Sequence, residues 1–197
     1  MKQHSSSVLA IAAILFTLPV AAQIAFTANS SLLSGTYGNP SCVVDMNGDH
    51  LDDVVRFNGN TMTIAYQQAG GGFVQVNAVT ATVNPNWSIS VGDLDANGYN
   101  DVLIGNGSAN SFLRANSDGT AYTEQYFSPY IFSQRTNMAD INNDGLLDAW
   151  SCHDVGLSKP YRNTGGGVMV EDQSPIQQTV TVGGNYATVF TDYDEDG

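Results

Sequence analysis

The sequence predicts an all-β protein built from a repeated unit of about 50 residues. Three observations lead to this fold class. A short acidic segment recurs in register at residues 45–53, 93–101, 140–148 and 192–197, with first positions 48, 47 and 52 residues apart. A glycine-rich or Asp-Gly turn follows each complete acidic segment, in a stretch that begins 20 or 21 residues after its start. No long stretch shows an apolar period of helical type, so helices should be almost absent.

The chain begins with a segment typical of a secretory signal peptide. Lys2 precedes an apolar run at residues 8–18, and small residues follow at 20–22. The run is shorter than a membrane-spanning helix needs, so we expect cleavage after residue 22 rather than an uncleaved anchor. The mature chain should therefore be secreted or held at the cell surface. We expect residues 23–37 to form an N-terminal lead strand.

Each repeat should contain four short strands. Runs of β-branched and aromatic residues flank both the acidic segment and the glycine turn. The order is thus strand, acidic loop, strand, turn, strand, glycine hairpin, strand. A four-stranded unit of this length is the size of a β-propeller blade. We place the blades at about residues 38–85, 86–132, 133–184 and 185–197.

The last of these blades is only a beginning. A propeller normally needs at least four blades to close. This sequence holds three and reaches Gly197 inside an acidic segment. We therefore expect three blades plus the start of a fourth, and a chain that is part of a longer protein.

The charge of the chain limits the classes of partner. It has 19 acidic and 6 basic residues and a formal net charge of −13. Nucleic acids and acidic membrane surfaces are poor partners for such a chain, whereas cations are good ones. Fourteen of the acidic residues lie in the four repeated segments. A solvated acidic surface would scatter them, so their clustering indicates cation sites.

The spacing within the acidic segments predicts calcium sites. Calcium takes six to eight oxygen ligands, and a sharply turning loop supplies them from alternate positions. Positions 1, 3 and 5 carry carboxylates or amides, position 7 offers a backbone carbonyl, and position 9 carries a closing aspartate. The predicted ligands are Asp45, Asn47, Asp49, Leu51 and Asp53; Asp93, Asp95, Asn97, Tyr99 and Asp101; and Asp140, Asn142, Asp144, Leu146 and Asp148. We expect about one ion per complete loop, and weak binding at most from Asp192, Asp194 and Asp196.

Two other interpretations compete with calcium loops of this kind. An EF-hand needs a glutamate at position 12 and flanking helices, whereas position 12 holds Arg56, Ile104 and Ser151 and the flanks read as strands. Metal-free turns, in which Asp and Asn accept hydrogen bonds from their own backbone, are the second. Three carboxylates gathered in each loop repel one another without a cation, which favours calcium. His50 stands where the other loops have glycine, so we expect weaker binding in the first loop.

Several other residues allow a functional and a plainer interpretation. Cys42 and Cys152 lie in apolar strand-like runs, where a buried free thiol is common, although a disulfide between them stays open. His153 and Asp154 could pair as a base and its orienting acid, but no nucleophile motif accompanies them, so we expect no catalytic residue. Aromatic residues that recur along the blades are expected to be core, with a sugar-stacking platform as the alternative. They are Trp87, Trp150, Tyr66, Tyr99, Tyr122, Tyr126 and Tyr161.

The motif Asp-x-Asn-Gly-Asp-x-x-x-Asp followed by an apolar strand resembles the FG-GAP/VCBS repeat. Residues 44–55 and 139–148 carry the motif most closely, and the resemblance extends over about residues 38–197. It implies an integrin-alpha-like propeller of the type found in secreted bacterial proteins, with seven or a similar number of blades and one calcium on the loop of most blades. It implies no single activity, since such propellers accompany adhesion modules, enzymes and sorting domains.

These features predict a secreted calcium-binding β-propeller that acts as a protein- or glycan-binding, adhesion or scaffolding module and is not itself an enzyme. The expected partner is an extracellular protein or glycan, not a nucleic acid, and the mature chain should have no membrane span. One alternative is the non-catalytic propeller part of a secreted polysaccharide-degrading enzyme whose active site lies beyond residue 197. Another is a purely structural spacer.

Overall fold

The structure is a computed structural model that describes residues 29, 31–35, 38, 40–174 and 184–192. The chain divides into two units, Met1–Ser30 and Ser31–Gly197. The predicted signal peptide and most of the predicted lead strand lie outside the described residues, and residues 31–35 form turns and bends. Among the described residues, no helix is long and apolar enough to cross a membrane.

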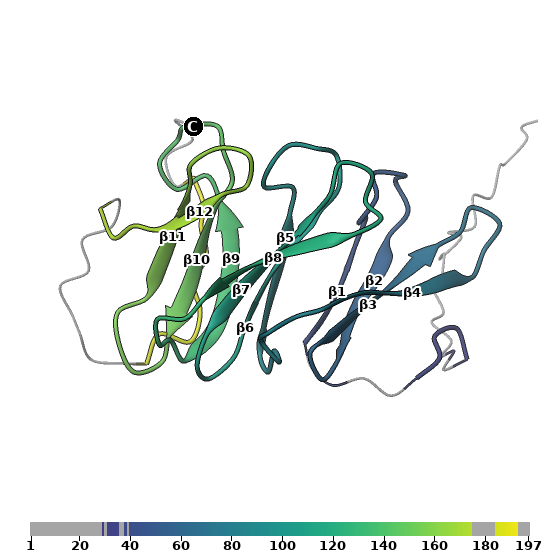
Figure 1. Cartoon of the computed structure of the whole chain (residues 1–197), viewed down its shortest axis with the longest axis horizontal. Coiled ribbons are helices and arrows are strands. Elements are labelled where there is room, and N and C mark those ends of the chain that lie inside the picture. Colours follow the sequence, from purple (N-terminus) through teal and green to yellow (C-terminus); the bar gives the residue numbers. More distant parts are fainter. Residues whose placement is uncertain (1–28, 30, 36–37, 39, 175–183, 193–197) are drawn as a thin grey trace, which may run out of the picture. The chain divides into compact units, whose positions relative to one another are not determined.

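Three four-stranded antiparallel sheets follow one another along the chain (Figure 1). The first contains β1 (Ser41–Val44), β2 (Asp53–Asn58), β3 (Thr61–Gln67) and β4 (Phe73–Thr80). The second contains β5 (Ser88–Gly92), β6 (Asp101–Gly105), β7 (Asn110–Ala115) and β8 (Tyr122–Phe127). The third contains β9 (Ser133–Ala139), β10 (Asp148–His153), β11 (Lys159–Asn163) and β12 (Met169–Glu171). Each strand pairs with its neighbours in sequence, so the described part of the chain forms three blades of a partial β-propeller, as predicted.

The position of each strand in its blade follows from its apolar pattern. The second strands β2, β6 and β10 are mostly buried along their whole length, and β6 is a continuous apolar run from Val102 to Ile104. Such a run is typical of a strand covered on both faces. The outer strands β4 and β8 instead alternate between more and less exposed residues, because one of their faces meets water. The glycine turns join β3 to β4 and β11 to β12 as hairpins, with positive φ at Gly71, Gly72 and residues 165–167.

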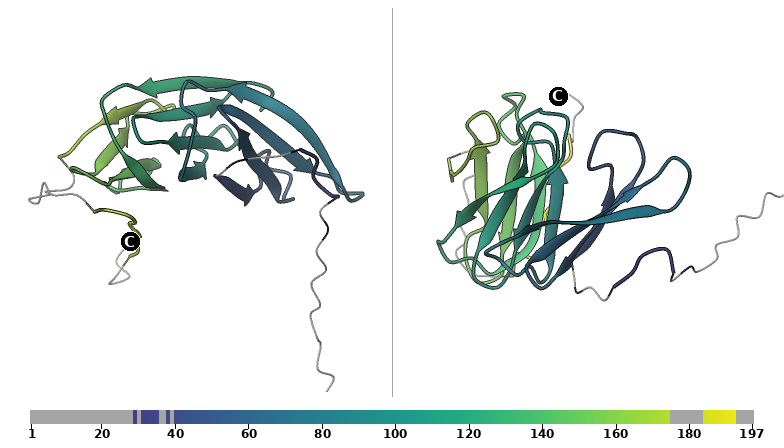
Figure 2. Two further views of the ribbon diagram at one scale, coloured as in Figure 1. Left: turned by 90° about the horizontal axis from the view of Figure 1, so that it is seen from below. Right: turned by 45° about the vertical axis from the view of Figure 1, so that its right-hand side comes forward.

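The core lies between the blades, which are side by side in chain order (Figure 2). Val102 and Ile104 of β6 pack toward the first blade in a cluster that includes Phe57 and Ile64. Leu103, between them, packs toward the third blade in a second cluster. The alternation follows from the two-residue period of a strand. One central strand therefore supplies apolar contacts to both neighbouring sheets.

Buried polar contacts add to the boundary between the second and third blades. Ser88 Oγ donates to Thr136 Oγ1 at 2.8 Å, and Asn110 Nδ2 donates to the hydroxyl of Tyr161 at 3.0 Å. The ring of Tyr161 meets Phe112 edge to face at 5.3 Å between centroids. These groups are paired with each other instead of with water, which makes their burial tolerable.

The described C-terminal segment, residues 184–192, lies against the third blade. Asn137 Nδ2 donates to the carbonyl of Thr188 at 2.9 Å, and the ring of Phe190 meets Trp150 edge to face. The Thr188 hydroxyl also lies 3.1 Å from the sulfur of Cys152. Cys152 and Cys42 are free thiols, as expected, and burial raises the pKa of Cys42 to about 11.

The aromatic residues divide into core and surface. Trp150 and Tyr161 are buried, as expected for core residues. Trp87 and Tyr126 are 50% and 47% exposed, so a core role is wrong for these two. Trp87 stacks on Phe132 at 5.2 Å on the surface instead. The other three tyrosines are half-buried at the boundary between the first and second blades.

Candidate metal centres

The three complete acidic segments form loops between the first and second strand of each blade. In every loop the position-1 carboxylate accepts at least two backbone hydrogen bonds from its own loop. The N–H of position 5 donates to one oxygen at 3.3, 3.1 and 3.1 Å, and the N–H of position 6 donates to the other at 2.8, 2.8 and 2.7 Å. The position-1 residues are Asp45, Asp93 and Asp140. The three loops therefore share one backbone conformation despite different sequences.

Side chains at positions 3 and 5 continue this pattern. The position-3 oxygen accepts the N–H of position 5 at 3.2, 3.2 and 3.1 Å. The position-5 oxygen accepts the N–H of position 7 at 2.9, 2.8 and 3.0 Å. These bonds are the Asx turns that a metal-free loop would also form. They orient each side chain, because an oxygen that holds a loop N–H is fixed relative to the loop backbone.

Two positions of each loop have positive φ. Position 6 was the expected one, and it has φ of 66° at His50, 90° at Gly98 and 85° at Gly145. Position 4 was not expected, and it has φ of 75° at Gly48 and 57° in both other loops, at Ala96 and Asn143. Glycine and asparagine tolerate this region well, whereas alanine does so at a cost. The alternation of left-handed and right-handed residues turns the chain tightly enough to bring positions 1, 3 and 5 to one side.

The position-9 aspartates have a role in the fold that their spacing did not reveal. Asp53, Asp101 and Asp148 are 0%, 0% and 2% exposed. One oxygen of each accepts the N–H of loop position 2, at 2.9, 2.8 and 3.0 Å. The other accepts an N–H at or next to the end of the third strand, at 2.8 Å in all three blades. Each aspartate thus fastens its loop to the sheet, in addition to its predicted role as a metal ligand.

Electrostatic surroundings differ along each loop. Burial raises the pKa of Asp101 to about 6; hydrogen bonds from Ala115 and Leu94 oppose the shift, and the nearby carboxylates of Asp95 and Asp93 add to it. Burial also raises the pKa of Asp53, with the same opposition from two backbone N–H groups. At Asp45 burial is the largest single effect and favours a higher pKa, but four backbone hydrogen bonds together outweigh it, so the pKa is lowered. The acid most buried in the second loop is therefore the one that gains most from a nearby positive charge.

The second loop brings its carboxylates together most closely. Oxygen atoms of Asp93, Asp95 and Asp101 all lie within 4.8 Å of one another. These are positions 1, 3 and 9. The first and third loops have an asparagine at position 3, so their acids are placed at positions 1, 5 and 9 instead. All donors are oxygens, which fits a hard cation such as calcium.

The remaining predicted ligands are less constrained by the structure. Leu51, Tyr99 and Leu146 at position 7 donate their N–H groups to position 5, and their carbonyls stay predicted ligands. In the fourth segment, Asp194 and Asp196 lie outside the described residues, and Asp192 is the last residue that the structure describes. Calcium binding there stays a prediction as well.

A profile of the family described as FG-GAP-like repeat matches residues 45–104 and again residues 93–151. The chain belongs to the FG-GAP-like repeat family. Each match begins at the first aspartate of an acidic loop and contains two loops, so the family unit starts one strand later than the structural blade. A search of curated proteins found no match.

FG-GAP loops of the first two blades contact each other directly. Asn100, at position 8 of the second loop, donates its side-chain amide to the carbonyl of Asp45 at 2.5 Å and its backbone N–H to the carbonyl of Met46 at 3.2 Å. Gly48 approaches the Gly98 carbonyl so closely that a Cβ would lie 3.1 Å from its oxygen. The two loops are therefore coupled through their backbones.

The residues at position 2 also hold each loop in place, a role that the spacing of the motif did not predict. They donate the N–H that the position-9 aspartate accepts, and two of them, Met46 and Leu94, are buried at the foot of their loops. Ile141 holds the same place in the third loop. Their regular apolar character was visible in the sequence, and it marks the point where each FG-GAP loop is anchored in the core.

Proposed function

We propose that this FG-GAP propeller is a secreted calcium-binding module that binds a protein or glycan partner outside the cell. The observation that carries the proposal is the second loop, where three carboxylates lie within 4.8 Å of one another. Asp101 in this group is fully buried, and a buried charge is costly unless an opposite charge lies nearby. A divalent cation supplies that charge.

The residues present fit calcium better than a softer metal. Each loop offers carboxylate, amide and backbone carbonyl oxygens, and its predicted ligands include no cysteine or histidine. Hard oxygen ligands in a flexible loop are what calcium prefers. When bound, calcium neutralises the loop carboxylates, while the chain's own Asx turns hold the ligands in place. The module itself supplies a rigid set of blades on which binding surfaces are displayed.

Calorimetric titration of chelator-treated protein tests the proposal. We expect about three calcium ions per chain, one for each complete loop. Binding to the native state alone should also raise the melting temperature, since 100-fold excess over Kd contributes roughly 2.7 kcal/mol per site. Asp118→Asn is a matched control, because Asp118 is an exposed acid outside the loops. A melting temperature that is the same in calcium and in excess EDTA would contradict the proposal, as would preferential tight binding of zinc.

Secretion forms a separate part of the proposal and has its own test. The N-terminal segment has the charge, apolar length and small residues of a signal peptide. Mass spectrometry of the exported protein should find Gln23 as its first residue. An intact N-terminus on membrane-bound protein would instead favour the uncleaved anchor.

A further inference from the structure

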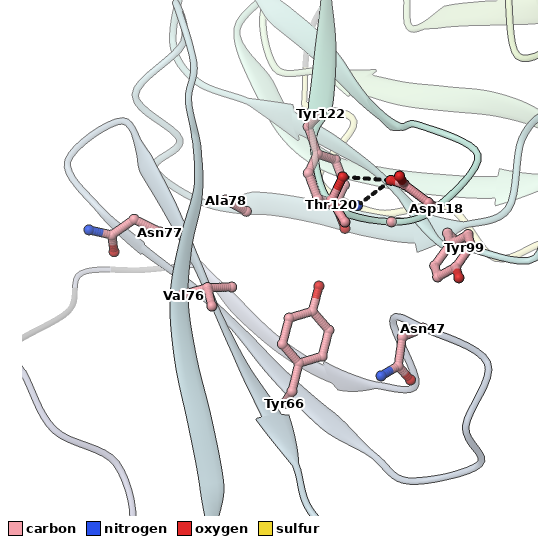
Figure 3. A pocket seen from close by; sticks show the side chains of 10 residues that line it. Asn47, Tyr66, Val76, Asn77, Ala78, Tyr99, Asp118, Thr120 and Tyr122 are labelled. Atoms are coloured by element: carbon pink, nitrogen blue, oxygen red, sulfur yellow. Dashed lines mark hydrogen bonds between the residues drawn. The ribbon is translucent and has the colours of Figure 1, made fainter.

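A pocket of about 510 Å³ opens between the first and second blades (Figure 3). The first blade contributes Tyr66 from β3 and Asn47 from its acidic loop. The second blade contributes Tyr99 from its acidic loop, Tyr122 from the start of β8, and the hairpin that joins β7 to β8. Pockets of about 300–1,000 Å³ with aromatic walls and a few polar groups are the usual size and character of small-ligand sites.

The equivalent place between the second and third blades is filled. Arg114 occupies the place that Tyr66 has in the first blade, because each lies one residue before the third-strand N–H that the position-9 aspartate accepts. Its guanidinium donates to the Gly166 carbonyl at 2.9 Å, and Gly167 packs so closely that a Cβ would lie 3.0 Å from Arg114 Cδ. Met169, in the place of Tyr122, is buried. The open pocket is therefore a specific feature of the first boundary, produced by its tyrosines.

The pocket wall is preorganised. The Tyr66 side chain points from the first blade toward Thr120 and Tyr122 of the second blade, across the space between them (Figure 3). Asp118 accepts hydrogen bonds from the backbone N–H and the hydroxyl of Thr120, at 3.0 and 2.5 Å. The ring of Tyr99 packs against Gly119, where a Cβ would overlap it. A wall held in this way loses little freedom when a ligand binds.

The chemistry of the wall selects a ligand class. Its polar groups are tyrosine and threonine hydroxyls, asparagine amides and one carboxylate, and none of the described residues that line it is Lys, Arg or His. An anionic ligand would meet Asp118 and a chain of net charge −13, with no cationic side chain in the wall to bind it. Hydroxyls and amides offer donors and acceptors together, which matches a ligand rich in hydroxyl groups. Tyrosine rings accept the C–H faces of such a ligand while their hydroxyls bind its polar edge.

We propose that this pocket binds a neutral saccharide unit, an inference that rests on the proposed function and names its ligand class. The three tyrosines pack on the apolar faces of the sugar ring, and the amide, hydroxyl and carboxylate groups bind its hydroxyls. Asn47 and Tyr99 also belong to the first and second acidic loops. Calcium bound in those loops would therefore hold two sides of the pocket, and chelation should weaken saccharide binding.

Calorimetric titration of the whole secreted chain in calcium, with glucose, galactose, mannose, N-acetylglucosamine and cellobiose, tests this inference. At least one of these neutral sugars should bind. Tyr66→Ala should lower the affinity about tenfold or more, because it removes a ring from the wall. Tyr122→Phe keeps the ring and removes one hydroxyl, so it should lower the affinity by roughly threefold to tenfold without disturbing the fold. The matched control is Tyr126→Ala, an exposed tyrosine of β8 outside the pocket, which should leave the affinity unchanged.

Several results would overturn the inference. The first is that folded protein binds none of these sugars. The second is that the Tyr126 control loses as much affinity as the pocket variants. The third is that glucuronate or choline binds more tightly than every neutral sugar. Calcium binding is measured on the same samples, which separates this inference from the proposed function. Calcium bound at three sites with no saccharide bound overturns the pocket alone. Saccharide binding by a chain that takes up no calcium supports the pocket and contradicts the calcium proposal.

Discussion

The first and second acidic loops share a common set of backbone hydrogen bonds but place their charges differently. In the second loop the acids at positions 1, 3 and 9 come together, and position 6 is Gly98. In the first loop Asn47 replaces the position-3 acid, and His50 occupies the left-handed position 6. Two properties of the motif are therefore separate. Backbone hydrogen bonds determine the shape of the loop, whereas the side chain at position 3 determines how closely the carboxylates gather.

The largest expected effect comes from the position that both loops share. Asp101→Ala should destabilise the calcium-free protein by about 2–4 kcal/mol, because it leaves two buried backbone N–H groups without an acceptor. Asp53→Ala should cost a similar amount, since it removes the same two bonds from the first blade. Urea unfolding in EDTA measures both. Asp118→Ala, which removes hydrogen bonds only within the exposed turn before β8, serves as the control. A cost no larger than the control's at either position would show that the two bonds of the position-9 aspartate do not stabilise the fold.

Exchanging the position-3 residues should reverse the difference between the loops. Asp95→Asn should lower calcium affinity in the second loop about tenfold, and Asn47→Asp should raise it in the first by a similar factor, because ligand charge tunes affinity in such loops. Each substitution changes charge at nearly constant size. Calorimetry on the two single variants and the double variant measures the effect. Equal affinities in all variants would mean that position 3 does not coordinate the ion.

A smaller effect is expected at position 6. Gly98→His should destabilise the second loop by about 1–2 kcal/mol, since a residue with a Cβ is strained at φ of 90°, although the space there is open. His50→Gly should relieve this strain in the first loop and stabilise the protein by up to about 1 kcal/mol. The greater entropy of glycine in the unfolded chain reduces this gain. Thermal melts with and without calcium measure both changes. If His50→Gly lowers stability in calcium, the histidine makes a contact that outweighs its strain.

The smallest expected effect is on the pH dependence of stability, and it arises at a histidine outside the acidic loops. Burial lowers the pKa of His153 below 6.5, and Lys159 lowers it further while Asp154 opposes the shift. The unfolded chain therefore takes up this proton at a higher pH than the folded chain does. Stability from neutral His153 is present above pH 6.5 and is lost as the pH falls through its folded pKa.

His153→Asn removes this titration and keeps an acceptor near the Val155 N–H, which donates to Nδ1 of the histidine at 3.2 Å. In EDTA, the variant should lose less stability than the parent between pH 7 and pH 5. Denaturant unfolding at the two pH values measures the difference. Identical losses would mean that other groups, first of all the loop carboxylates, cause the whole loss of stability at low pH.

The repeat, the strands and the loop conformation could all be predicted from the sequence because they depend on neighbours along the chain. Asx turns join residues two to five positions apart, strand patterns alternate every two residues, and both recur in three copies. His50 at positive φ could be anticipated for the same reason. The family followed from these local features alone.

What the tertiary structure decided involves residues brought together from different strands or blades. The hydrogen bonds that Gln67 donates to Asp53 and Ala115 donates to Asp101 each cross 14 positions, so no spacing rule within the loop reveals them. Trp87 lies on the surface and Tyr161 in the core because only one of them faces a neighbouring sheet. The pocket depends on residues from two blades, since Tyr66 and Tyr122 line an open space whereas Arg114, in the place of Tyr66, contacts the opposing hairpin. That outcome is set by the shape of the opposing blade, which the sequence of one repeat does not contain.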